Sequence, residues 1–235
     1  MGAWCPDHKR VKELWRRRFR TEGKIPACIF ARRFDNSRGP VIFPAGKQER
    51  QVIMKLLFFS DVHGSPESLD LLLRQAERLE PDQLILLGDV LYHGPRNPLK
   101  TDYAPRKVAE MLNARRDRII AVRGNCDSEV DQMLLEFPLM ADYSTVFADG
   151  RRFFLTHGHL WNPEKLPPVP PDSVFAFGHI HLPVLRKEKS GLTVFNPGSI
   201  SLPKGGNPPS FGFYRDHALR ILNLENGEEM ASLSL

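Results

Sequence analysis

Five short polar motifs in this sequence carry side chains of the types that bind divalent metal ions. In chain order they are Asp61-x-His63, Gly88-Asp89, Gly124-Asn125, His157-Gly158-His159 and His179-x-His181. Five of the eight histidines in the chain fall in these motifs. Carboxylate, amide and imidazole ligands without a thiolate suit a hard or borderline ion such as Mn²⁺. One motif of this kind is a weak signal, whereas five in one chain predict a metal centre.

Each motif follows an apolar run that predicts a short buried strand. The first three strands are expected at residues 54–59, 83–87 and 118–122, separated by helices at 66–79 and 105–115. This alternation of strand and helix predicts a parallel sheet. Ligands of an open α/β sheet bind beyond the carboxyl ends of its strands, so we expect the motif side chains to meet at that edge.

The second half of the chain changes character and predicts mostly short strands. They are expected at residues 144–148, 152–156, 173–177, 184–187, 193–195, 212–214 and 219–224. The fold class predicted from the two halves together is α/β, with two mixed sheets packed face to face and helices outside them.

The positive charge of the chain is concentrated in its first 53 residues. That segment holds 13 Lys and Arg against 5 Asp and Glu, whereas residues 54–235 hold 20 against 23. We expect a basic, disordered extension at residues 1–53 and one domain at residues 54–235, with Met54 as the natural start of the protein. A basic arm that meets polyanions and a targeting segment are two other interpretations of the extension.

The remaining composition predicts the setting in which the protein works. The chain has three cysteines, Cys5, Cys28 and Cys126, and no Cys-x-x-Cys motif, which favours a reducing compartment. No stretch is long and apolar enough for a membrane span, and the first residues have no apolar signal core. These features predict a cytoplasmic protein that does not contact the membrane.

The ordered set of motifs resembles the calcineurin-like metallophosphoesterase superfamily and, more narrowly, the YfcE-type bacterial phosphodiesterases. The resemblance covers residues 54 to about 230 and includes the stretches 88–97, 122–129 and 196–199. It implies a four-layer α/β/β/α sandwich and a metal-dependent phosphoric diester hydrolase with two divalent ions at the sheet edge. Mn²⁺ is the expected ion, and Zn²⁺, Fe²⁺, Ni²⁺ and Mg²⁺ are alternatives.

The same resemblance implies a set of metal ligands. One ion would be held by Asp61, His63, Asp89 and His181, and the other by Asp89, Asn125, His157 and His179. A ligand that bridges two ions needs two oxygens, which agrees with a carboxylate at Asp89. The implied reaction is hydrolysis of a phosphodiester by a water that the two ions activate, without a covalent intermediate.

Two candidates for catalysis lie beside Asn125. Cys126 stands where many members of the superfamily carry a histidine that helps the leaving group, and a thiol is a poorer acid–base group than imidazole. Asp127 is expected to orient the site rather than to bind a metal.

Four more residues are candidates for contact with the substrate or the ligands. His159 is expected to orient a metal ligand, with a direct phosphate contact or a cap on its own loop as the alternatives. Arg96, His93 and Arg123 are candidate phosphate contacts, because the arginine fork matches phosphate oxygens. A surface position for Arg123, and a purely structural role for Arg96 in its own loop, are the competing interpretations.

Other functions compete with the phosphodiesterase. A non-catalytic, metal-binding scaffold can share this fold, but such a protein can relax its ligands, and all seven ligand positions here carry competent residues. A phosphatase or nuclease acting on other phosphate esters is a further alternative. The net negative charge of residues 54–235 weighs against a nucleic-acid partner for this part. The expected partner is a small-molecule phosphodiester, and a homo-oligomer is compatible with the sequence.

Overall fold

The computed structural model describes residues 53–235. The predictions for the basic extension and its start concern the segment outside this range, so they stay predictions. Within the described residues, no helix combines the length and the apolar character that crossing a bilayer requires.

The first half of the described chain alternates strands and helices, as predicted. Its elements are β1 (Leu56–Phe59), α2 (Pro66–Leu79), β2 (Gln83–Leu86), α3 (Pro105–Asn113), the 3-10 helix η1 (Arg116–Arg118) and β3 (Ile119–Ala121). Helix α2 has the predicted bounds because Pro66 begins it and the Ser65 hydroxyl accepts a hydrogen bond from the Ser68 N–H at 3.3 Å.

The second half contains one short helix and eight strands. They are α4 (Glu129–Gln132), β4 (Tyr143–Ala148), β5 (Arg151–Thr156), β6 (Val174–Ala176), β7 (Pro183–Lys187), β8 (Thr193–Pro197), β9 (Ser210–Arg215), β10 (Ala218–Asn223) and β11 (Glu229–Ser234). All seven strands predicted in this half are present. The sequence predicts neither α4 nor β11, because α4 has no buried residue and β11 has no fully buried one, so neither carries a hydrophobic period.

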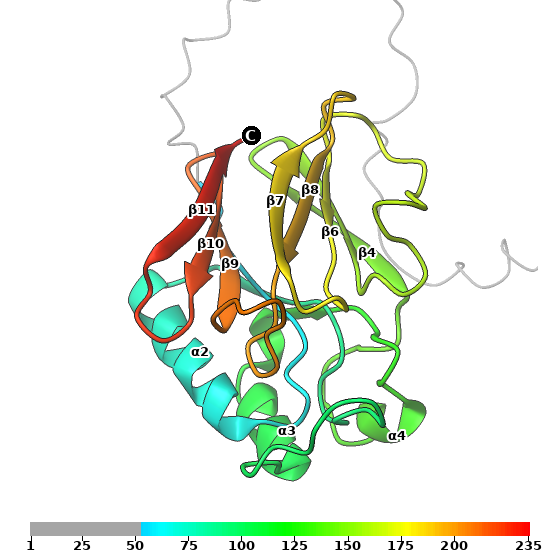
Figure 1. Cartoon of the computed structure of the whole chain (residues 1–235), viewed down its shortest axis with the longest axis vertical. Coiled ribbons are helices and arrows are strands. Elements are labelled where there is room, and N and C mark those ends of the chain that lie inside the picture. The colour runs from blue at the N-terminus through cyan, green and yellow to red at the C-terminus, as the bar shows by residue number, and fades with distance from the viewer. Residues whose placement is uncertain (1–52) are drawn as a thin grey trace, which may run out of the picture. The chain divides into compact units, whose positions relative to one another are not determined.

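The strands form two mixed sheets, which confirms the predicted fold class. The first has the order β11-β10-β9-β1-β2-β3, and the second has the order β4-β5-β6-β8-β7. Strands β1, β2 and β3 are parallel, with Leu57 opposite Leu84, while β9 joins the other side of β1 in antiparallel register. Figure 1 shows strands β9 to β11 of the first sheet beside β6 to β8 of the second.

Alternating side chains divide the core into layers. Leu57 and Phe59 face α2 and α3, whereas Phe58 points into the space between the sheets and meets Phe153 and Phe195 of the second sheet. The ring centroids of Phe58 and Phe195 lie 5.3 Å apart at 81°, an edge-on packing that favours a single arrangement of the two sheets.

The resemblance implies a layer of helices on the outer face of the second sheet, but a loop covers this face instead. Here Phe154 and Phe175 pack against Trp161 and Val169, which belong to the segment between β5 and β6. Within residues 53–235 this cover contains no helix, because prolines interrupt the segment repeatedly. The helices α2 and α3 both pack on the first sheet.

Candidate metal centre

Three of the five motifs lie in loops whose non-glycine residues take an uncommon backbone conformation. Asp61, His63, Asp89, His179 and His181 all have positive φ, between 46° and 69°. Non-glycine residues seldom adopt this left-handed region, and they cluster there at functional sites. The loops hold one another in place: the Asp61 N–H donates to the Gly88 carbonyl at 3.1 Å, and the His63 N–H donates to the Asp89 carbonyl at 3.0 Å.

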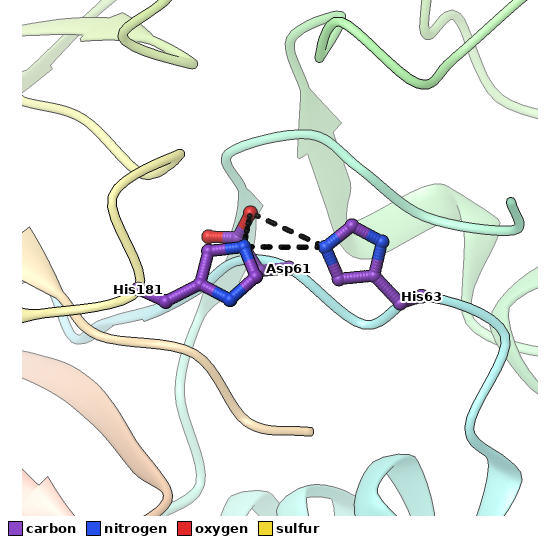
Figure 2. A group of neighbouring side chains, drawn as sticks. All are labelled: Asp61, His63 and His181. Carbon is purple, nitrogen blue, oxygen red and sulfur yellow. Dashed lines mark hydrogen bonds and ion pairs between the residues drawn. The ribbon is translucent and has the colours of Figure 1, made fainter. Parts of the chain in front are cut away.

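The inner pocket is formed by Asp61, His63 and His181. Figure 2 shows the two ring nitrogens and one carboxylate oxygen pointing toward one another. The Nε2 atoms of His63 and His181 are 3.3 Å apart, and His181 Nε2 is 3.2 Å from Asp61 Oδ1. All three side chains are buried, so the pocket lies beneath the surface of the cleft edge.

Backbone carbonyls fix the orientation of the imidazole rings. The Nδ1 atoms of His63, His181 and His157 lie 2.9, 2.7 and 2.6 Å from the carbonyl oxygens of Tyr92, Leu202 and Leu87. A carbonyl oxygen only accepts, so each Nδ1 is the donor, and Nε2 of a neutral ring presents a lone pair. This is the arrangement in which metal-binding histidines are usually held.

The inner pocket fits a cation. Burial lowers the pKa of His63, which favours its neutral ring, and its Nε2 lies 3.3 Å from His181 Nε2. Asp61 Oδ1 is buried and has no hydrogen-bond donor within the described part of the chain. Burial favours the neutral acid at Asp61, but the neighbouring His181 and His157 rings outweigh it and lower the pKa of the carboxyl group. A buried carboxylate beside two imidazole nitrogens is stabilised when a proton or a metal ion lies among them.

The outer pocket is formed by Asp89, Asn125, His157 and His179. His157 Nε2 lies 3.2 Å from Asn125 Oδ1 and 3.4 Å from Asp89 Oδ2. One ligand atom each of Asp89, His157 and His179 lies within 4.8 Å of the others. Asn125 is exposed and His179 is half-buried, so this pocket opens toward solvent more than the inner one does.

Asp89 stands between the two pockets. Its Oδ2 is 3.8 Å from His63 Nε2 of the inner pocket and 3.4 Å from His157 Nε2 of the outer pocket. Its Oδ1 accepts a hydrogen bond from the Cys126 N–H at 2.9 Å. A bridging ligand was expected to use two oxygens, and in the structure Oδ2 is the oxygen that lies within 4 Å of an imidazole in each pocket.

The Asp127 side chain clamps the loop that carries Asp89. Its Oδ2 accepts from the N–H groups of Asp89 and Gly124 at 2.8 and 2.7 Å, and its Oδ1 accepts from the Val90 N–H at 2.8 Å. Burial raises the pKa of Asp127 to about 6, although these three donors favour the carboxylate. A Cβ on Gly124 would collide with the Asp89 carboxylate, so glycine is required for the two loops to approach this closely.

The charges within the centre are strongly coupled. Burial disfavours the charged ring of His157, but the Asp89 carboxylate facing it outweighs burial and raises the pKa of His157 to about 9. Burial and the nearby His157 lower the pKa of His179. In the absence of a metal ion, a proton on His157 therefore supplies the positive charge that Asp89 faces.

Cys126 lies against this centre as a neutral thiol. Burial, together with the adjacent Asp89 carboxylate, raises the pKa of its thiol. Such a thiol is neither a nucleophile nor a ready proton donor at neutral pH. One ligand atom of Cys126 also lies within 4.8 Å of atoms of His63 and Asp89, so the thiol borders both pockets.

Of the three residues predicted to contact phosphate, one lines the cleft and two make other contacts. Arg96 is exposed and lines the cleft beside the centre. Arg123 instead pairs with Asp142 at 2.6 Å, and His93 packs between the rings of Tyr92 and Tyr103.

His159 lies beside two ligand rings without bonding to them. Its ring centroid is 5.5 Å from that of His157 and 6.3 Å from that of His179. The Nδ1 of His159 has no hydrogen-bond partner among residues 53–235. His159 was predicted to orient a ligand ring, but the His157 ring is oriented by its Nδ1 contact with the Leu87 carbonyl.

The segment 196–201 supports the centre from below. The hydroxyl groups of Ser199 and Ser201 both donate to the Asp61 carbonyl, at 2.9 and 2.8 Å, and the Asn196 amide donates to the Gly178 carbonyl at 2.7 Å. Asn196 and Ser199, which belong to a stretch that carries the family resemblance, are fully buried. Paired hydroxyls aimed at one carbonyl leave no pattern in the sequence that reveals them.

A cleft of about 1080 Å³ opens onto this edge of the sheets. The predicted ligands Asp89, Asn125, His179 and His181 line it, and so do Arg96 and Lys204. Neither cation is paired with a carboxylate in the described part of the chain, so both are free to meet an anion. Sequence reasoning missed Lys204, because a lone lysine in a glycine-rich loop resembles any surface lysine.

Known proteins share this region of the chain. A family model described as the calcineurin-like phosphoesterase superfamily domain matches residues 54–215. Phosphodiesterase YfcE of Escherichia coli (strain K12) is 48% identical over 183 residues, which make up 78% of this chain and 99% of that protein. A solved structure of YfcE, a phosphoesterase from E. coli, is 48% identical with a TM-score of 0.75 and covers 77% of this chain and 99% of that chain.

A solved archaeal phosphodiesterase is 22% identical, with a TM-score of 0.52, and the match covers 77% of this chain and 100% of that chain. This likeness concerns the fold alone. All five motifs lie inside the residues that the family model matches. The two mixed sheets and their helices agree with the architecture of the E. coli structure. The chain belongs to the calcineurin-like phosphoesterase superfamily.

Proposed function

We propose that this chain is a metal-dependent phosphodiesterase that holds two divalent ions, with Mn²⁺ as the preferred ion. The single observation that carries the proposal is the position of Asp89 Oδ2 between the imidazoles of two adjoining pockets. The 48% identity to a phosphodiesterase over almost its full length supports the reaction class. We further propose that residues 54–235 form the complete catalytic unit, because this part carries every ligand.

Asp61, His63 and His181 would hold the inner ion, Asn125, His157 and His179 the outer ion, and Asp89 both. When bound, the ions would supply Lewis acidity and an activated water for in-line displacement at phosphorus. The carbonyls of Tyr92, Leu87 and Leu202 fix three of these rings through Nδ1, which leaves each Nε2 as the atom that would bind an ion.

The chain's own side chains then have distinct tasks in the cleft. Arg96 lines the cleft, and its guanidinium fork would donate hydrogen bonds to the phosphate oxygens. Cys126 stays protonated because its thiol pKa is raised, so it does not attack phosphorus and no covalent intermediate forms on it. With no imidazole at this position to donate a proton, good leaving groups should react best.

The test is hydrolysis of bis(p-nitrophenyl) phosphate and of p-nitrophenyl phosphate by metal-stripped protein, with Mn²⁺, Zn²⁺, Mg²⁺ or no ion added. We expect cleavage of the diester to depend on the metal, to be fastest with Mn²⁺, and to exceed cleavage of the monoester. A folded, metal-loaded protein that cleaves neither ester would identify a metal-binding scaffold. Faster cleavage of the monoester would identify a phosphatase.

A further inference from the structure

An exposed apolar wall borders the cleft next to the metal centre. It is formed by residues 129–134, which follow Asp127 directly and include α4. The side chains of Val130, Met133 and Leu134 are 66%, 84% and 41% exposed, and no residue of α4 is buried. Val130 and Leu134 line the cleft, whereas Met133 does not. Apolar side chains gathered in this way, without a place in the core, mark a binding surface.

The backbone of the 129–134 wall is held firmly. Asp131 accepts hydrogen bonds from the N–H and the hydroxyl of Ser128 at 2.7 and 2.9 Å, which caps the helical turn. The Gln132 amide donates to the carbonyls of Leu135 and Phe137 at 3.0 and 2.9 Å. The backbone that carries the apolar side chains is therefore ordered before a ligand binds, which reduces the entropy lost on binding.

Helix α3 adds a further anchor to the 129–134 wall. The Asn113 amide donates to the Leu134 carbonyl at 2.8 Å, and its oxygen accepts from the Glu136 N–H at 2.9 Å. The next residue, Leu135, is buried in the core. The chain thus turns Leu135 inward while leaving Leu134 on the cleft.

An aromatic ring in the same cleft complements the 129–134 wall. Tyr92 is 41% exposed and lines the cleft. Its ring packs edge-on against His93 with centroids 4.7 Å apart, and His93 packs in the same way on Tyr103 at 5.3 Å. This stack holds the tyrosine ring in place, and aromatic faces bind flat apolar groups with a geometry that aliphatic side chains alone do not provide.

We infer that Val130 and Leu134 of the 129–134 wall, together with Tyr92, select phosphodiesters that carry an apolar, aryl-sized ester group. The inference rests on the proposed phosphodiesterase function and names the substrate class of that site. The reacting phosphate lies at the ligand end of the cleft, and the ester group extends along Val130 and Leu134. A diester with two small or charged ester groups leaves these side chains in water and gains nothing from them.

The test measures binding without turnover. Diphenylphosphinate and dimethylphosphinate carry the same single negative charge as a diester, and their P–C bonds are not hydrolysed. Calorimetry on the full Mn²⁺-loaded chain should show diphenylphosphinate binding at least about tenfold tighter than dimethylphosphinate. Val130→Thr and Leu134→Asn should each weaken diphenylphosphinate about three- to tenfold and change dimethylphosphinate by less than about twofold.

Met133→Thr is the matched control, because this side chain belongs to the same segment and faces away from the cleft. It should leave both affinities unchanged. Equal affinity of the wild type for both phosphinates, or equal weakening of both by the wall variants, would overturn the inference. If bis(p-nitrophenyl) phosphate is still cleaved in that case, the proposed function stands and the inference alone fails. No cleavage and no phosphinate binding would overturn both.

Discussion

Two regions that line the same cleft differ in polarity and in burial. At the ligand edge, Asp61, His63 and Asp89 are polar, buried and tied by hydrogen bonds to neighbouring loops. On the 129–134 wall, Val130 and Leu134 are apolar and exposed, and only their backbone is tied down. The edge supplies charged and polar groups that can bind ions, whereas the wall supplies apolar surface that a substrate can cover. Substitutions at the edge should therefore change the reaction itself, and substitutions in the wall should change the choice of substrate.

The largest effect is expected at the residue that both pockets share. Asp89→Asn removes the negative charge that faces His63 and His157, so metal affinity and diester hydrolysis should both fall. The loss in kcat/KM should be on the order of 1000-fold or more, since the ions contribute several kcal/mol to transition-state stabilisation. Steady-state assays with bis(p-nitrophenyl) phosphate measure it.

Asp142→Asn is the control for this variant, because Asp142 is a carboxylate beside the centre that pairs with Arg123 instead of facing the pockets. We expect its kcat/KM to stay within about twofold, as for most exposed ion pairs. Similar losses in the two variants would mean that carboxylates near the cleft act through net charge, and the contrast between edge and surroundings would be lost.

A smaller effect is expected where a residue positions the edge without touching the ions. Asp127→Asn replaces an acceptor by a donor and loses at least one of the bonds to the N–H groups of Asp89, Gly124 and Val90. Because supporting residues of this kind cost about 10- to 100-fold when removed, Mn²⁺ affinity and kcat should fall by that range. A change in KM for the ester with normal Mn²⁺ affinity would argue that Asp127 contacts substrate instead.

The coupled charges at the edge predict how Mn²⁺ binding depends on pH. The raised pKa of His157 means that its ring is protonated below about pH 9 in the metal-free protein, whereas a ligand must be neutral. Mn²⁺ binding should therefore release a proton, and the affinity should rise about tenfold per pH unit between pH 7 and 9. Calorimetry in buffers of different ionisation enthalpy counts the proton, and pH-independent binding would exclude His157 as the group displaced.

The smallest effect is expected outside both regions. A chain of residues 54–235 keeps every ligand and the 129–134 wall, so its kcat/KM should stay within about twofold of that of the full chain. A loss of tenfold or more, with unchanged Mn²⁺ affinity, would show that the first 53 residues take part in substrate binding. Such a result would add a third region to the comparison of edge and wall.

The sequence predicted the edge well because its constraints are local. A polar pair at the end of an apolar strand identifies Asp61 and His63, and Ser65 followed by Pro66 identifies the start of α2. Asp61 and His63 meet through left-handed backbone conformations and not through the alternation of an extended strand. These conformations depend on bonds to the next loop, which no local pattern encodes.

The 129–134 wall and the supports beneath the edge could not be predicted in the same way. A four-residue helix with no buried side chain has no hydrophobic period, so Val130 and Leu134 look like ordinary surface residues in the sequence. The two serine hydroxyls that hold the Asp61 carbonyl come from a segment about 140 positions away. Both features depend on tertiary contacts that only the folded chain brings together.

The most direct test of the central claim, that Asp89 stands between two metal pockets, is to count the ions that bind. Equilibrium dialysis of the full chain against Mn²⁺ should give two ions per chain for the wild type. His63→Ala in the inner pocket and His157→Ala in the outer pocket should each leave one tightly bound ion, and Asp89→Ala should weaken both. A wild type that binds a single ion would contradict the account. So would the loss of all tightly bound Mn²⁺ in one of the histidine variants.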